Sequence, residues 1–312
     1  PNVAGPHPDL GLAVDGRTDA LSDNLRQHQR EGTSYLIGTW LKTTDALTAQ
    51  VSVFARYSSL TFTPDAPADL LFTGISQAAR KRDAAVGIQA EGVYVLNDTH
   101  TLRGGVIAQA DRATSRTRSL VLPLDASGAQ TSDRPLVIDD RSGRSAQTWS
   151  LFLQDEWSIA DTVTLNYGLR YDRLHAFRDE DQLSPRVNLV WSPDGGPTLH
   201  AGYARYFTPP PFELVASDTI AKFAGTTAEP PGIRNDPPLS ERTHYLDVGA
   251  EQKFGGLTLG IDAYDKQISH MLDEGQFGAP IILTPFNYRV GRVRGPLQHT
   301  HRFQLVDQLT GS

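Results

Sequence analysis

The stretch Val163 to Tyr171, VTLNYGLRY, decides the fold because its two sets of alternate positions differ in character without a break. The odd-numbered positions are all apolar or aromatic: Val163, Leu165, Tyr167, Leu169 and Tyr171. The positions between them hold Thr, Asn, Gly and Arg. A period of two is typical of a β-strand whose faces meet different surroundings. One face of this strand suits lipid and the other suits water.

The same alternation recurs along the chain. It covers residues 47–57, 84–96, 102–110, 246–253 and 257–266. Phe54 and Ile107 are exceptions, since each stands among the polar set of its segment. We expect about ten to twelve long antiparallel strands, with alternating segments of about nine to thirteen residues.

The connections between these segments are of two kinds. Short turns rich in Asp, Asn and Gly are expected at Ala160-Asp161, Asn97–Thr99, Pro193–Gly196 and Gly255-Gly256. Long polar loops are expected at Arg112–Ala146, Leu174–Ser184 and Thr208–Glu241. Bacterial outer-membrane barrels have short periplasmic turns and long extracellular loops. The sequence therefore predicts an all-β fold, a partial transmembrane antiparallel β-barrel, in the bacterial outer membrane.

The composition of the chain excludes several other classes of protein and chemistry. No apolar run approaches the roughly 18 residues of a spanning helix, which excludes a helical membrane protein. The absence of cysteine removes disulfides and thiolate chemistry. The net charge is −7 and the chain has no Lys/Arg block, so nucleic acid is not expected as a partner, whereas outer-membrane lipid is.

Aromatic residues near strand ends suggest a girdle at the membrane interfaces. They are Tyr57, Tyr94, Trp149, Trp157, Tyr167, Tyr171, Trp191, Tyr203 and Phe207. The alternative explanation is that aromatic residues favour strands in any setting.

Several stretches together resemble the barrel of TonB-dependent receptors. They are Trp149–Trp157 (WSLFLQDEW), Leu165–Asp172 (LNYGLRYD), Leu183–Trp191 (LSPRVNLVW), Leu199–Pro210, Glu241–Phe254 and Gly260–Ile268. The order and spacing of these pieces make the resemblance fairly specific.

The resemblance implies an outer-membrane receptor for energy-coupled uptake of a scarce small-molecule ligand, siderophore-like or other, without a cofactor. It also implies the TonB energy-transducing complex as a partner, acting through a plug domain. Nothing in the chain resembles that plug or a TonB box, and the expected strands are fewer than the about 22 of plugged transporters. The alternatives are a passive channel or structural barrel, and a hydrolase acting at the barrel rim.

We therefore expect residues 1–290 to form a partial barrel and residues 291–312 to be a diverged or frame-shifted tail that lacks the family's terminal aromatic residue. The chain is expected to be a truncated or split gene product, or else a barrel that closes at a smaller size. An open strand edge in lipid costs several kcal/mol for each unpaired backbone group.

Two sets of candidate site residues follow. Polar residues expected to face the lumen are Glu156, Arg170, Asp172, Arg186 and Asn188. They either pair with one another across strands or contact a ligand. Expected ligand-binding residues in or near the long loops are Tyr206, Phe207, Phe212 and Arg234, whose aromatic and cationic groups suit an anionic iron chelate.

Catalytic and metal sites are not expected. No G-x-S-x-G motif accompanies Ser217-Asp218, Asp83 or His244, which are the candidates for chemistry at the rim. His299 and His301 share a strand face but lack a third ligand. The acidic run Asp179–Asp181 lacks the glycine and oxygen spacing of a calcium loop.

Overall fold

The protein, in a computed structural model, is one antiparallel sheet of eleven strands in which each strand pairs with its neighbours in the chain. The structure describes residues 7–210, 218–229, 238–255, 257–276 and 283–303. The strands are β1 (His28–Thr43), β2 (Leu47–Thr63), β3 (Ile75–Val95), β4 (His100–Val121), β5 (Leu136–Ala160), β6 (Val163–His175), β7 (Asp179–Trp191), β8 (Thr198–Thr208), β9 (Glu241–Phe254), β10 (Leu257–Gln276) and β11 (Leu283–Phe303).

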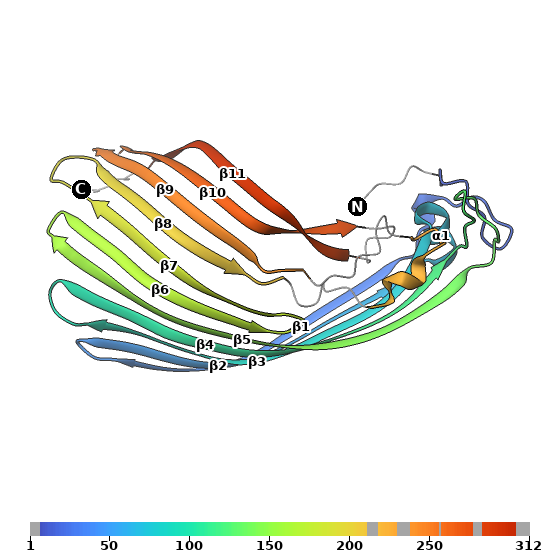
Figure 1. The fold of residues 1–312 in the computed structure, drawn as a ribbon, viewed down its shortest axis with the longest axis horizontal. Helices are drawn as coiled ribbons and strands as arrows, with labels where there is room; N and C mark the ends of the chain where they lie inside the picture. The colour runs from blue at the N-terminus through green and yellow to red at the C-terminus, as the bar shows by residue number, and fades with distance from the viewer. Residues whose placement is uncertain (1–6, 211–217, 230–237, 256, 277–282, 304–312) are drawn as a thin grey trace, which may run out of the picture.

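The sheet is an open, curved trough (Figure 1). The strand order runs from β1 at one edge to β11 at the other, and these two strands do not pair among the described residues. The predicted partial barrel of ten to twelve strands is therefore confirmed. Residues 291–303 continue β11 and pair with β10, while a diverged tail over residues 291–312 stays a prediction.

The short turn predicted at Ala160-Asp161 joins β5 and β6 into a hairpin. Trp157 of β5 pairs with Leu165 of β6, and Leu151 pairs with Tyr171. The short turns also lie where they were expected, and left-handed glycines occupy two of them, Gly195 with φ 69° and Gly255 with φ 61°. Register and turns together hold the apolar positions of adjacent strands on a common face.

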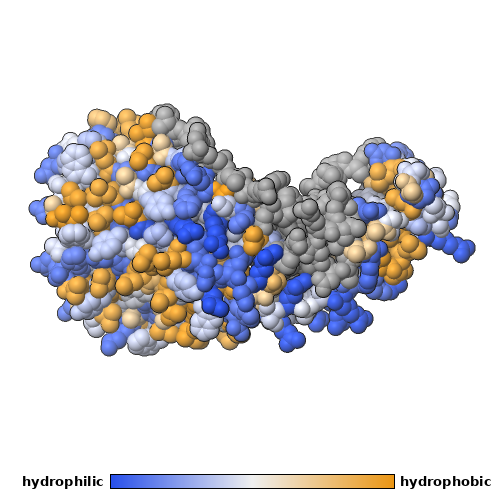
Figure 2. Space-filling view, viewed as in Figure 1, coloured by the Kyte–Doolittle hydropathy of each residue, from blue (hydrophilic) through white to orange (hydrophobic). Residues whose placement is uncertain are grey.

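The two faces of the sheet differ sharply in exposure. On the apolar face Leu151 and Leu153 are 60% and 63% exposed. On the opposite face Ser150 and Asp172 are 4% and 6% exposed, because side chains converge on the concave side of a curved sheet. Figure 2 shows hydrophobic residues gathered over the wide part of the sheet. A broad exposed apolar band of this kind requires a non-aqueous partner.

Two of the predicted long loops are wrong. The loop expected over Arg112–Ala146 shrinks to residues 122–135, because β4 and β5 continue as a paired ribbon. The loop expected over Leu174–Ser184 shrinks to residues 176–178. Beyond the apolar band both faces of these strands carry polar residues, so the period of two vanishes although the backbone pairing continues. The long connection between Thr208 and Glu241 is confirmed.

Two elements were not predicted. The strand β1 has apolar side chains on both faces, with Tyr35, Leu36 and Ile37 in succession, and this masks the alternation. Helix α1 (Ala66–Thr73) has proline in its first turn and ends at Gly74, whose φ is 75°. Proline at the start and glycine just after the end are sequence signals of a short helix.

A small core lies at the long-loop end, near α1 and η3 (Asp218–Phe223), where the Thr227 hydroxyl donates to the carbonyl oxygen of Gly74 at the end of α1. One cluster joins Val14, Leu70, Leu71 and Leu122, and the other joins Ile75, Val121, Ile138, Phe223 and Ala228. Gln130, in the β4–β5 connection, binds the segment that precedes β1. Its side-chain Oε1 accepts a hydrogen bond from the backbone N–H of Ala13 at 2.9 Å. None of the helices in the described part of the chain has the length and apolar character needed to cross a membrane.

Candidate functional site

The register gathers the polar side chains of β2 to β10 on one face of the sheet. The five residues expected to face the lumen all lie on this face: Glu156, Arg170, Asp172, Arg186 and Asn188. Arg170 Nη2 lies 2.8 Å from Asp172 Oδ1, and the Ser150 hydroxyl donates to the same oxygen at 2.5 Å. Glu156 pairs with Arg103 of β4 at 3.2 Å. Three of the five therefore have partners on the sheet, and their charges are already engaged by protein groups instead of by a ligand.

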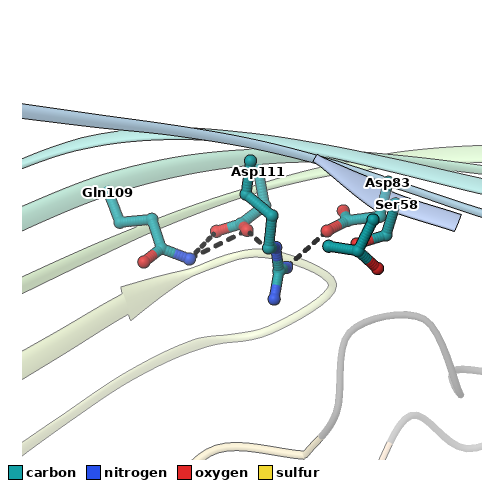
Figure 3. Close-up of polar contacts among 6 residues, drawn as sticks. Ser58, Asp83, Gln109 and Asp111 are labelled. Carbon is teal, nitrogen blue, oxygen red and sulfur yellow. Dashed lines mark hydrogen bonds and ion pairs between the residues drawn. The ribbon is translucent and has the colours of Figure 1, made fainter. Parts of the chain in front are cut away.

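A second charged group lies on the same face at β2, β3 and β4. Arg56 Nη2 lies 2.5 Å from Asp83 Oδ2 and 3.9 Å from Asp111 Oδ1, and the Gln109 amide donates to both oxygens of Asp111 at 2.8 Å. Figure 3 shows Ser58, Asp83, Gln109 and Asp111 on the same side of the sheet. Asp83, a candidate for rim chemistry from the sequence, is therefore neutralised by a guanidinium.

Three tyrosines lie together on this face, and we refer to Tyr206, Tyr245 and Tyr264 as the tyrosine cluster. The rings of Tyr245 and Tyr264 stack with centroids 5.8 Å apart. The ring of Tyr206 meets Tyr245 edge-on at 6.3 Å. Tyrosine presents a large apolar surface with one polar tip, which suits contact with an aromatic ligand.

Two cations flank the tyrosine cluster. Arg186 pairs with Ala204, which pairs with Tyr245, and Tyr245 pairs with Lys266 on its other side. This row places a positive charge on each side of a tyrosine ring. In the described part of the chain, neither Arg186 nor Lys266 forms an ion pair. The sequence indicated only Tyr206 and Arg186 of this group, because the pairing across β8, β9 and β10 could not be read from the chain.

His200, Asp247 and Asp262 form a further cluster near the short-turn end. His200 Nε2 lies 3.2 Å from Asp262 Oδ1 and 3.5 Å from Asp247 Oδ2. Gly202 and Gly249 leave room for these groups, since a side chain at either position would collide with them. The described residues contain no group of three or more side chains arranged to hold a metal ion.

The other sequence candidates are dispersed. Phe207 lies on the apolar face, one position beyond Tyr206, so the register directs it away from the tyrosine cluster. His244 also lies on the apolar face, where its Nδ1 is 2.9 Å from the Tyr203 hydroxyl. Phe212, Arg234 and Ser217 lie outside the described residues, as do the side chains of Asp218, His299 and His301.

The acidic run at the start of β7 contacts protein donors. Asp179 contacts the ring of His175, and the Tyr171 hydroxyl donates to Asp181 at 3.2 Å. Glu180 accepts hydrogen bonds from the backbone and the hydroxyl of Ser240, both at 3.0 Å. These three carboxylates point to different partners instead of converging on one point.

A hollow of ≈580 Å³ opens in the long-loop region beside the small core. Its lining includes Asp125, Gly128, Thr226 and Glu229. Hydrogen bonds from the Ser127 hydroxyl and from the backbone of Ala129 and Ser127 lower the pKa of Asp125. The hollow therefore keeps an acidic side chain ionised at the rim.

A comparison with known proteins identifies the family of the chain. The family described as TonB dependent receptor-like, beta-barrel, matches residues 4–295. The chain belongs to this family of TonB-dependent receptor barrels. The resemblance of the stretches between Trp149 and Ile268 to this family is therefore confirmed.

Individual relatives of this receptor barrel are more distant. It is 36% identical over 74 residues to the TonB-dependent transporter Oar of Myxococcus xanthus, a match that covers 20% of this chain and 7% of Oar. The copper transporter OprC superimposes with a TM-score of 0.65 at 16% identity, covering 89% of this chain and 45% of OprC. The ferric yersiniabactin uptake receptor FyuA of Yersinia pestis superimposes with a TM-score of 0.60 at 13% sequence identity, and the match covers 85% of this chain and 40% of FyuA. The chain thus spans less than half the length of these structures.

Membership orients the receptor barrel in the bacterial outer membrane. The short turns face the periplasm, the long loops face the outside, and the apolar face meets lipid. All nine residues of the predicted aromatic girdle lie on the lipid face by register, including Phe207. The matched family is one of TonB-dependent receptor barrels and not of enzymes, so the rim-active hydrolase is set aside.

Asp155, Tyr167 and His100 form a polar group at the periplasmic end of the lipid face. Asp155 accepts hydrogen bonds from the Tyr167 hydroxyl at 2.9 Å, and the ring nitrogen of His100 lies 2.7 Å from the same oxygen. His100 stacks on Trp157 with ring centroids 5.5 Å apart. Polar groups that hydrogen-bond to one another beside a tryptophan fit the membrane interface, where lipid gives way to water.

Proposed function

We propose that this barrel is part of a receptor that binds an anionic metal chelate on its lumen face and imports it. The observation that carries the proposal is the tyrosine cluster flanked by Arg186 and Lys266. The rings supply contact area and the cations supply charge for a ligand that carries both aromatic groups and negative charge. A related structure supports this choice, since FyuA is a ferric yersiniabactin uptake receptor.

The location of the tyrosine cluster suits a binding site. Tyr206 lies two residues from the outer end of β8, just below the long connection to β9. It is 45% exposed, so its ring is accessible from the lumen. A ligand captured by the outer loops would meet these side chains early on its way inward.

Free copper is the second candidate ligand, because OprC is a copper transporter with the same fold. The described lumen residues contain no assembled metal site, and the three carboxylates of β7 are engaged with protein donors. We therefore favour a chelated metal over the free ion.

The test is a titration of the full chain, refolded in neutral detergent, with ferric catecholate and ferric phenolate siderophores and with Cu²⁺, followed by tryptophan fluorescence. Tyr245→Ala should weaken siderophore binding about tenfold, which corresponds to roughly 1.4 kcal/mol. Tyr203→Ala, on the lipid face of the neighbouring strand, is the matched control and should bind as the parent does. Equal losses in the two variants, or binding of Cu²⁺ alone, would contradict the proposal.

Energy coupling is the second part of the proposal. We infer that import needs the TonB complex, acting through a plug domain. A passive channel is the competing hypothesis. Co-expression of the chain with a family plug, in cells with and without the transducer, separates the two, since only a coupled receptor loses uptake of the ferric chelate when the transducer is removed.

A further inference from the structure

Exposed arginines gather on the lipid-facing side of the sheet, just beyond the outer limit of the apolar band. Following β3 outward, the last apolar position is Ala84, and the next position on the same face is Arg82. On β4, Arg112 follows Ala110 in the same way. The change from small apolar residues to arginine marks the level at which hydrocarbon ends on both strands.

Three further arginines stand directly beside one another, and we call Arg80, Arg116 and Arg141 the arginine row. Arg80 of β3 pairs with Arg116 of β4, and Arg116 pairs with Arg141 of β5. All three are exposed. Like charges directly opposite each other destabilise a sheet. The three adjacent positive charges therefore destabilise the sheet unless an anion binds to them.

The described residues do not supply that anion. Within the described residues, no carboxylate lies within ion-pair distance of Arg80, Arg116 or Arg141. The nearby Arg118 does have a partner, Asp139, at 3.7 Å. The row thus retains three guanidinium groups that are free to bind an external ligand.

The height of the row above the apolar band suits the headgroup region. Arg116 is four residues beyond Arg112, which is about 13 Å along the strand at ~3.3 Å per residue. With a strand tilt of ~40°, that corresponds to about 10 Å of height above the edge of the hydrocarbon. The row also faces away from the lumen, so a solute passing through the barrel does not meet it.

We propose that the arginine row, extended by Arg82 and Arg112, binds the phosphate groups of phosphorylated glycolipids in the outer leaflet. Guanidinium groups bind phosphate oxygens in bidentate fashion and keep their charge at any physiological pH. A lipid is the occupant that the structure favours, because the row continues the lipid-facing surface and its charge is complementary to an anionic headgroup.

The experiment measures binding of diphosphorylated lipid A to the full chain in neutral detergent, by native mass spectrometry and by thermal unfolding. The triple variant R80Q/R116Q/R141Q should lose affinity for lipid A at least tenfold. The triple lysine variant at the same positions keeps the charge and should lose less. The matched control R17Q/R26Q/R134Q removes three exposed arginines of the loop end and should bind as the parent does.

The lipid itself provides a second comparison. Dephosphorylated lipid A should bind the parent no better than it binds the triple glutamine variant, and inorganic phosphate alone should not compete at equal concentration. Without lipid, the triple glutamine variant should unfold at the same or a higher temperature than the parent, because repulsion is relieved. Unchanged lipid A affinity in this variant, an equal loss in the loop control, or equal binding of dephosphorylated lipid would overturn the proposal.

Discussion

The ring of Phe54 on β2 occupies the space that a side chain at Gly87 on β3 would fill. The two residues are direct register partners on the lumen face. A Cβ atom at Gly87 would overlap the Phe54 ring and would lie 2.8 Å from the carbonyl oxygen of Ala108. Phe152 covers Gly105 in the same manner on β5 and β4. Apolar side chains on the polar face are therefore accommodated by glycines opposite them.

Gly87→Ala should destabilise the sheet because the new methyl group collides with both the Phe54 ring and a backbone oxygen. We expect a loss of roughly 1–3 kcal/mol, typical of overpacking. Gly92→Ala on the same strand is the control, since its nearest neighbour would lie 3.6 Å away, at ordinary contact distance. Thermal unfolding of the two variants in detergent checks this, and equal stability would show that the ring moves aside freely.

Arg56→Gln should destabilise the protein more than Arg103→Gln does. Removal of Arg56 takes away the guanidinium that contacts both Asp83 and Asp111, whose side chains are only 13% and 11% exposed. Arg103 and Glu156 form a half-exposed pair, so that loss should stay within about 1 kcal/mol. We expect roughly 1–3 kcal/mol for Arg56→Gln, and partial recovery in Arg56→Gln/Asp83→Asn. If the double variant is as unstable as the sum of the single changes, the two residues are not coupled.

Asp69 should make the loop end more stable at acid pH. Burial raises the pKa of this α1 carboxyl from 3.8 to about 6, although the Gln27 amide donates to it at 2.6 Å. The folded state therefore holds the proton at a pH where the unfolded chain has released it. The resulting stabilisation is complete below pH 3.8 and is lost as the pH rises through 6.

Hydrogen exchange of α1 at pH 4 and pH 7 measures this effect. Exchange rates corrected for their intrinsic pH dependence should show α1 better protected at pH 4 in the parent. Asp69→Asn should abolish that difference, whereas Asp45→Asn, in an exposed turn, should preserve it. An unchanged pH dependence in Asp69→Asn would assign the effect to another group.

The β-hairpins could be predicted from the sequence because each apolar face meets lipid. The alternation from Val163 to Tyr171 is continuous since every odd-numbered residue faces hydrocarbon. Past Ala110 on β4, the apolar band ends and both faces carry polar residues, so Arg112, Thr114 and Arg116 no longer differ from their neighbours in polarity. The strand continues there through backbone pairing, which a hydrophobic pattern does not record.

The candidate site was less predictable than the fold. Tyr206 could be selected because it lies at a strand end, but Tyr245 and Tyr264 join it only through the register of β8, β9 and β10. Phe207 was expected beside Tyr206, but it lies on the apolar face, because a shift of one position in a strand moves a side chain to the opposite face. Selecting one face of a strand requires knowledge of which set of positions is apolar along its neighbours.

The most direct test of the account is spin-label accessibility along β6, since the chain contains no native cysteine to interfere. Single cysteines from position 165 to position 172, labelled in the detergent-refolded chain, should alternate in their collision rates. Labels at Leu165, Tyr167, Leu169 and Tyr171 should collide with oxygen dissolved in the detergent. Labels at Asn166, Arg170 and Asp172 should collide with a water-soluble nickel complex. Uniform accessibility, or a period of 3.6 residues, would contradict a sheet that separates lipid from an aqueous lumen.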